Sequence, residues 1–250
     1  MTSSSMSCYA NSSAASTSSR TNDSDTILIA NTLSNVRLGG REERQKALDR
    51  LEILKTISEL KLEHENVEKI EDEMRHSMDD MVGLREMNLT DADTDFIIRT
   101  MQSRETDVLY FALADNKLTY VGVKKLVEAI KKGKQGVRGL NLNGNPVGDA
   151  GVQYILKLFD NNIFEYLSIE DIGLTDNGVK ELVDGILQSK LSSPVKILFI
   201  GNNKRITDHS VKQLLRLVGL NQLVKIDIVG CSLSDEAKKQ LEQESPIFFV

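Results

Sequence analysis

The sequence predicts an α/β fold, a solenoid with parallel strands on its concave face, helices on its convex face and an N-terminal helical cap. Three observations lead to this prediction. Pairs of alternating aliphatic residues recur at a regular interval, a polar turn follows each pair, and an amphipathic helical stripe follows each turn. One strand and one helix cannot bury a core alone, so we expect such units to stack.

Five clear copies of the pattern each start with a pair of alternating aliphatic residues. The pairs are Phe111/Leu113, Leu140/Leu142, Leu167/Ile169, Leu198/Ile200 and Ile226/Ile228. The first residues of successive pairs are 29, 27, 31 and 28 positions apart. A weaker copy places Met87 and Leu89 in the same role. Side chains two positions apart on a strand point to the same side, so each pair is predicted to face the core.

A single turn residue stands three positions after each pair. Asn116, Asn145 and Asn203 occupy this position in three copies, while Ile172 occupies it in the third copy and Cys231 in the last. An asparagine amide can bond backbone groups of its own and the adjoining turn that would otherwise be unpaired. A thiol does this weakly and an isoleucine cannot, so we predict a structural ladder that is looser or differently turned in the third repeat.

Capping residues predict where each helix starts. Hydroxyl side chains stand at four expected N-cap positions, Thr119, Thr175, Thr207 and Ser234. An aspartate follows three of these caps and favours the positive end of the helix dipole. A small residue such as Gly178 comes three positions after each cap, and we expect helix and strand to approach closely there.

The helices are predicted from apolar residues at steps of zero, three, four and seven. Four stripes fit this template: Val123/Leu126/Val127/Ile130, Val152/Ile155/Leu156/Phe159, Val179/Leu182/Val183/Ile186 and Val211/Leu214/Leu215/Val218. All of these residues are predicted to face the core.

Two segments precede the repeats. Residues 1–40 form a predicted disordered tail, because residues 1–26 hold ten serines and four threonines and almost nothing to bury. A phosphorylated regulatory tail and the export signal of an injected bacterial effector are open alternatives to a plain flexible tail. Residues 41–83 form a predicted acidic helical cap, and the repeats with their C-terminal cap occupy 84–250. Within the cap, Leu60 and Leu62 also fit the strand of a degenerate first repeat, so helix and repeat both stay open.

The motif L-x-L-x-x-N-x-Φ-T-D-x-G-Φ is nearly complete at residues 113–123 and 140–152. On these residues the chain resembles the leucine-rich repeat family, in particular its long-repeat class with ribonuclease inhibitor, the Ran GTPase-activating protein and tropomodulin. The resemblance implies a curved stack that binds a protein partner. It also implies two alternative functions, regulation of a small GTPase and capping of actin filaments. The chain has fewer repeats than expected of the Ran GTPase-activating protein, and no functional residue carries over.

Composition argues against several function classes. The net charge of −6 lacks the basic excess of a nucleic-acid-binding protein and gives no attraction to anionic membranes. Cys8 and Cys231 are too few and too far apart for a disulfide framework, which predicts a reducing, cytoplasmic location. His64, His76 and His209 have no partners at metal-ligand spacing. We therefore predict no metal, no cofactor, no small-molecule substrate and no enzymatic activity.

The concave face is the predicted binding surface for another protein. The candidate contact residues are Asn88, Tyr110, Ala112, Asn141, Asn143, Ser168, Glu170, Phe199 and Asp227. Phe199 is the most informative, because an aromatic side chain on an open sheet is typical of a contact anchor. The alternatives are that Phe199 is merely exposed, or that the tail or the N-terminal helix covers it.

The sequence therefore predicts a non-enzymatic protein–protein interaction module without identifying its partner. An injected bacterial effector with such a binding domain is a further alternative. The final residues "SPIFFV" are predicted to cap the core, with Ile247, Phe248 and Phe249 folded over its end. The alternative is a free tail, in which Phe248 and Val250 bind a carboxylate-capturing partner.

Overall fold

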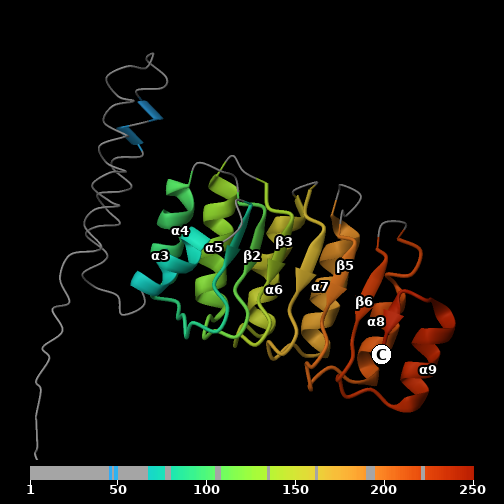
Figure 1. Ribbon diagram of the computed structural model, residues 1–250. Helices are drawn as coiled ribbons and strands as arrows, with labels where there is room; N and C mark the ends of the chain where they lie inside the picture. Colours follow the sequence, from blue (N-terminus) through green and yellow to red (C-terminus); the bar gives the residue numbers. More distant parts are fainter. Residues whose placement is uncertain are drawn as a thin grey trace, which may run out of the picture. The chain divides into compact units, whose positions relative to one another are not determined.

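The computed structural model (Figure 1) describes residues 45–46, 48–49, 67–76, 80–104, 108–133, 136–160, 163–189, 195–220 and 223–250. The chain divides into two compact units, Met1–Leu54 and Lys55–Val250. The described residues of the first unit are helical, and the side-chain amide of Gln45 donates to Asp49 over 2.8 Å. The predicted tail over 1–40 lies outside the described residues.

Seven parallel strands form one sheet in chain order (Figure 1). The strands are β1 (Met81–Gly83), β2 (Tyr110–Ala112), β3 (Gly139–Asn141), β4 (Tyr166–Ser168), β5 (Ile197–Phe199), β6 (Lys225–Asp227) and β7 (Phe248–Phe249). Their register aligns one apolar residue from each strand: Val82, Phe111, Leu140, Leu167, Leu198, Ile226 and Phe248. All seven are buried. The sheet confirms the predicted α/β fold of stacked strand-and-helix units.

Helices alternate with the strands and cover one side of the sheet (Figure 1). They are α3 (Val67–His76), α4 (Thr94–Ser103), α5 (Tyr120–Lys132), α6 (Val152–Ile155), α7 (Asp176–Gln188), α8 (Val211–Leu215) and α9 (Asp235–Glu244). Helices α5 and α7 are regular over 13 residues each. By contrast, α6 and α8 are short and are flanked by 3₁₀ turns, at Asp149–Gly151 and Leu156–Asp160 around α6 and at Asp208–Ser210 before α8.

Tight turns after α6 and α8 change which residues enter the core. After α8, the N–H of Leu217 donates to the carbonyl of Leu214, three residues back, over 2.9 Å. Leu217 is therefore buried, and Val218, predicted to face the core, is 36% exposed. After α6, Leu158 is buried while Leu156 is only half-buried. The predicted stripes were therefore wrong at Leu156 and Val218, and Leu215 is also only half-buried, whereas Phe159 is buried as predicted.

The first strand lies earlier than the sequence predicts. Strand β1 spans Met81–Gly83, and the buried pair is Val82 and Leu84 rather than Met87 and Leu89. Leu89 is buried, but in the turn that follows β1. The prediction was wrong because Met87 stands where other repeats carry the turn asparagine, which hides the correct alignment of this copy.

A helix precedes β1. Helix α3 packs against β1 and α4, and it buries Val67, Ile70 and Met74. Residues 67–76 are thus helical, as both interpretations of this segment require. Leu60 and Leu62, the strand of the proposed degenerate repeat, lie outside the described residues, so that alternative stays a prediction.

The chain end forms the last strand of the sheet. Strand β7 pairs with β6, and Phe248 is 5% exposed. Phe248 therefore caps the core and is not held in a free tail. The adjacent Phe249 points the other way and is 47% exposed, so the prediction that it also covers the core was wrong. Neighbouring residues on a strand face opposite sides, which is the physical reason for the difference.

Candidate functional site

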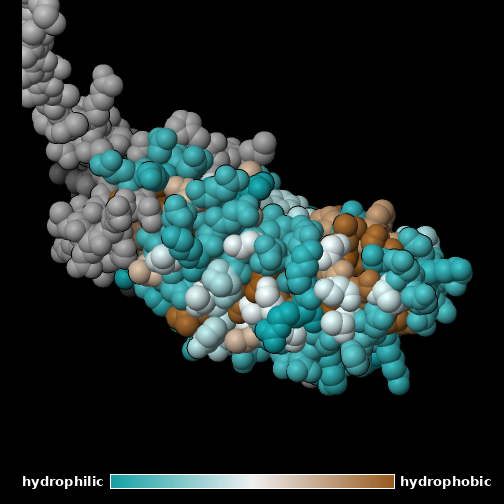
Figure 2. All heavy atoms as spheres, turned by 90° about the horizontal axis from the view of Figure 1, so that it is seen from below, coloured by the Kyte–Doolittle hydropathy of each residue, from teal (hydrophilic) through white to brown (hydrophobic). Residues whose placement is uncertain are grey.

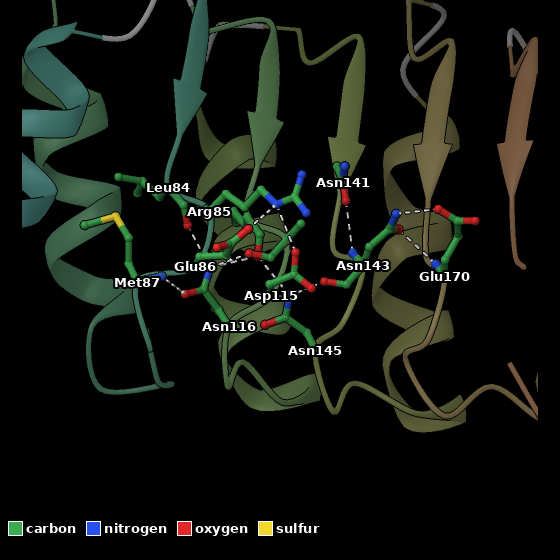
Figure 3. Close-up of polar contacts among 12 residues, drawn as sticks. Leu84, Arg85, Glu86, Met87, Asp115, Asn116, Asn141, Asn143, Asn145 and Glu170 are labelled. Carbon is green, nitrogen blue, oxygen red and sulfur yellow. Dashed lines mark hydrogen bonds and ion pairs between the residues drawn. The ribbon is translucent and has the colours of Figure 1, made fainter. Parts of the chain in front are cut away.

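Asparagine side chains join successive turns after the strands (Figure 3). The Oδ1 atom of Asn116 accepts from the backbone N–H groups of Met87 and Leu89, at 3.0 Å each. Its Nδ2 group donates to three carbonyl oxygens, of which that of Leu84 is the closest at 2.7 Å. Asn203 makes the same five bonds between the turns that follow β4 and β5. Each asparagine thus satisfies the backbone of the preceding turn as well as its own.

Ile172 interrupts this ladder without leaving a loose turn of its own. Ile172 offers no side-chain amide to the turn that follows β3. That turn is therefore closed by backbone hydrogen bonds instead. The N–H of Val147 donates to the carbonyl of Asn145, and the N–H of Gly148 donates to the carbonyl of Ile172, both over 2.8 Å. Gly148 adopts a φ of 60°, which favours glycine. The predicted difference exists, but it lies one repeat earlier than expected.

Aspartates form a second set of links between repeats. Asp149 accepts from the backbone N–H of Thr175 over 2.8 Å and from its hydroxyl over 2.5 Å. Asp91 bonds Thr119 in the same way, and Asp176 bonds the N-cap of the helix after its own. Burial alone would raise the pKa of Asp176, but hydrogen bonds from the Ser210 hydroxyl and from Thr207 hold its pKa below the ordinary value. From the sequence, the aspartates that follow the caps, such as Asp176, were interpreted only as partners of the dipole of their own helix.

Glycines after the caps Thr119 and Thr175 make room for two of these aspartates. A Cβ atom on Gly178 would collide with Oδ1 of Asp149 and with the side chain of Leu174. A Cβ atom on Gly122 would lie 2.9 Å from the Thr94 hydroxyl and would also collide with Asp91. The close approach predicted from sequence therefore exists, but its partner is the neighbouring repeat's aspartate rather than a strand.

The sheet face is the side of the sheet whose side chains point away from the helices. On the strands it comprises Met81, Gly83, Tyr110, Ala112, Gly139, Asn141, Tyr166, Ser168, Ile197, Phe199, Lys225, Asp227 and Phe249. Asn143, Glu170, Gly201 and Val229 continue it into the turns. Tyr110 lies across the bare backbone of Gly139, where an added Cβ atom would be 2.6 Å from the ring.

Two predicted contact residues are not available on the sheet face. Asn88 lies in the turn after β1 with a φ of 55°, because β1 begins earlier than expected. Ser168 is on β4 but only 1% exposed, and its hydroxyl donates to Oδ1 of Asn143 over 2.8 Å. Asn141, at the matching position of β3, accepts from the N–H of Asn143.

Four successive strands contribute to an aromatic cluster, defined here as Tyr166, Phe199, Lys225 and Phe249. The rings of Tyr166 and Phe199 meet nearly at right angles, with centres 5.7 Å apart. The Nζ atom of Lys225 lies 4.7 Å from the Phe199 ring centre and 4.3 Å from that of Phe249. Such contacts favour a cation over a ring face and fix the orientation of long side chains.

Two carboxylates lie beside the aromatic cluster. A Cβ atom on Gly201 would be 2.9 Å from Oε1 of Glu170 and 3.4 Å from Oδ1 of Asp227, so both carboxylates border the same bare backbone. The amide of Asn143 donates to Glu170 over 2.6 Å (Figure 3), and Lys225 pairs with Asp227 at 3.4 Å. Burial and the charge of Asp227 raise the pKa of Glu170.

Exposed apolar surface adjoins these groups. Val229 is 49% exposed and Phe249 is 47% exposed. In Figure 2, hydrophobic residues gather in the upper right of the view, over the part of the stack that holds β5 and β6. Sequence reasoning named Phe199 and Glu170 but missed Tyr166, Lys225 and Phe249. The first two stand just before a predicted inward aliphatic residue, and extending the alternation by one step would have found them.

A family comparison bears on the middle of the stack. Residues 137–156 match a family model described as "Leucine Rich repeat", and they span β3, its asparagine turn and α6. The match covers a single repeat of the stack. The other strands share its parallel register, so the stack is consistent with a solenoid of such repeats. No curated protein matches the chain.

Leucine-rich repeats are typical of non-catalytic, protein-binding domains. The specific class of the Ran GTPase-activating protein and tropomodulin is not shown by the match. Among the described residues, no group of His, Cys, Asp or Glu side chains could hold a metal ion. None of the helices in the described part of the chain is long and apolar enough to cross a membrane.

The raised pKa of Glu170 predicts that the stack gains stability when the carboxylate is removed. A raised pKa means that folding favours the protonated acid, so stability falls as pH rises from the unfolded pKa through the folded pKa. We expect Glu170→Gln to stabilise the fold at pH 7, by less than about 1 kcal/mol for this partly exposed group, and to have little effect near pH 3.5.

Thermal unfolding at the two pH values measures this effect. Glu165→Gln is the matched control, because a hydrogen bond from Lys196 lowers the pKa of Glu165. Glu165→Gln should therefore destabilise the fold at pH 7. A Glu170→Gln variant that is less stable than the parent at pH 7 would contradict the prediction.

Proposed function

We propose that this chain is a non-enzymatic module that binds a protein partner on its sheet face, centred on the aromatic cluster. The observation that carries the proposal is the cluster itself, three rings and a lysine on an open sheet face. Aromatic side chains are enriched among the few residues that supply most of the binding energy at protein interfaces, and near-neutral contacts around them exclude water.

The backbone beneath the cluster supports the same proposal. Tyr166, Phe199 and Lys225 stand on strands that are paired on both sides, and Phe249 stands on the last strand of the sheet. A surface held in this way loses little conformational entropy when a partner binds. We place the module in the cytoplasm on the sequence grounds given above.

The alternative functions rest on family resemblance alone. No contact among the described residues favours regulation of a small GTPase, capping of actin filaments or export as a bacterial effector. An assay of GTP hydrolysis with a panel of small GTPases separates the first of these from a binding module. Stimulation by catalytic amounts of the chain would overturn the non-enzymatic proposal.

Replacing Phe199 with glutamate is expected to weaken partner binding by at least about tenfold, because it removes the central ring and buries a charge in the interface. Affinity capture with the full chain, quantified by mass spectrometry, compares the parent, Phe199→Glu and Tyr120→Glu. Tyr120 is a matched control, an aromatic residue that is 44% exposed on α5. If the parent and Phe199→Glu capture the same partners in equal amounts, the proposed function is wrong.

A further inference from the structure

The surface formed by the carboxylates of Glu170 and Asp227 beside the aromatic cluster, called the notch below, specifies the chemistry of the partner, an inference that rests on the proposed function. We infer that a lysine or arginine side chain of the partner pairs with Glu170 and Asp227 from the solvent side, with an apolar neighbour on Phe249 and Val229. The partner is therefore a protein segment in which a basic residue adjoins an aliphatic or aromatic one.

The shape of the notch comes from Gly201. An added Cβ atom would lie 2.7 Å from the carbonyl oxygen of Val229 and 2.9 Å from Oε1 of Glu170. The absence of a side chain lets the carboxylates of Glu170 and Asp227 approach the backbone from adjacent strands. These oxygens fill the space over the buried Gly201, so a basic side chain meets the two half-buried carboxylates from the solvent side.

The charge of the notch is not balanced within the described part of the chain. Glu170 accepts from the Asn143 amide and forms no ion pair there. Asp227 pairs with Lys225, whose ammonium group also lies over two rings. Two carboxylates thus share one cation, and a second cation from a partner would complete the set. Charge complementarity of this kind selects partners and steers their association.

The apolar surface next to the notch indicates that the cation is a side chain of a protein segment. Phe249 and Val229 are each about half exposed and lie on the same side of β7 and of the turn after β6 as the carboxylates. A free small cation would leave this surface uncovered. A basic side chain followed by an apolar one would cover both parts at once.

Selection from a displayed library of random dodecapeptides, with the full chain as target and Phe199→Glu for counter-selection, tests the inference. We expect the enriched peptides to carry Lys or Arg beside an aliphatic or aromatic residue. Glu170→Gln should weaken their binding about tenfold, and added salt should weaken it further. Glu165→Gln should leave peptide binding unchanged, because Glu165 already pairs with Lys196 at 2.9 Å. Glu170→Lys should restore binding of a peptide whose basic residue is exchanged for glutamate.

The outcomes separate this inference from the proposed function. Enriched peptides that depend on Phe199 but lack a basic residue, or ignore Glu170→Gln, overturn the inference and leave the proposed function standing. A library that yields no Phe199-dependent peptide overturns both. The chain's own residues 27–38, "ILIANTLSNVRL", also combine apolar residues with a cation, Arg37. If Arg37→Glu strengthens peptide binding, this segment is the occupant and the assignment to a separate partner is wrong.

Discussion

Replacing Asn203 with alanine is expected to lower the free energy of unfolding by about 3 kcal/mol or more, because it leaves several buried backbone groups unpaired. Asn203 is 1% exposed and makes five hydrogen bonds through its side chain. Its Oδ1 atom serves the N–H groups of Ile172 and Leu174 in the preceding turn. Its Nδ2 group serves three carbonyl oxygens at the ends of β4 and β5. Urea unfolding followed by circular dichroism measures the change.

Cys231 is the matched control for this prediction, since it holds the equivalent position in the next repeat. Its thiol lies 3.5 Å from the carbonyl oxygen of Ile200, a single weak contact. Burial raises the pKa of this thiol to about 11, so it stays protonated at neutral pH. Cys231→Ala should cost about 1 kcal/mol or less. Equal losses for the two variants would show that the asparagine bonds add nothing beyond packing.

Replacing Phe248 with alanine is the second large change, with an expected loss of about 3 kcal/mol from the cavity that it leaves. Phe248 is 5% exposed and stands in β7, at the end of the sheet. Phe249→Ala is the control at the next position, and it should cost less than about 1 kcal/mol, the value of one exposed cation–ring contact with Lys225. Thermal and urea unfolding of the two variants give the comparison.

Binding should rank these two variants in the opposite order. Phe249 lies in the aromatic cluster, so Phe249→Ala should weaken peptides selected on the sheet face, while folded Phe248→Ala should retain them. A Phe249→Ala variant that unfolds as readily as Phe248→Ala would contradict the assignment of one ring to the core and the other to the surface.

The sequence was sufficient to predict the repeating fold, because strand pairs, turn asparagines and caps recur together. It misplaced β1 because Met87 replaces the turn asparagine. A further signal was overlooked, a left-handed backbone at the residue before each ladder position. Positive φ angles of 50° to 76° recur at Glu86, Asp115, Gly144, Asp171, Asn202 and Gly230. Five of the six are Asp, Asn or Gly, the residue types that tolerate this conformation, and Glu86 of the first repeat is the exception.

The candidate site was harder to predict than the fold. Alternation places Phe199 and Asp227 on one side of the sheet, but it cannot show that Lys225 reaches two rings from a neighbouring strand. The meeting of Glu170 and Asp227 depends on Gly201, which carries no side chain and so gave no signal as a candidate contact. Such convergence is set by three-dimensional packing between repeats that are about thirty residues apart in the sequence.

The asparagine and aspartate links together give the stack redundancy. At the junction of β4 and β5, Asn203 and Asp176 both bridge neighbouring repeats. The junction of β3 and β4 lacks the asparagine but keeps Asp149, whereas that of β2 and β3 has Tyr120 at the aspartate position but keeps Asn145. Each of these junctions therefore retains at least one tether. A repeat can therefore lose one tether by mutation and remain packed against its neighbour. This explains why neighbouring repeats share one backbone shape although their amino-acid sequences differ widely.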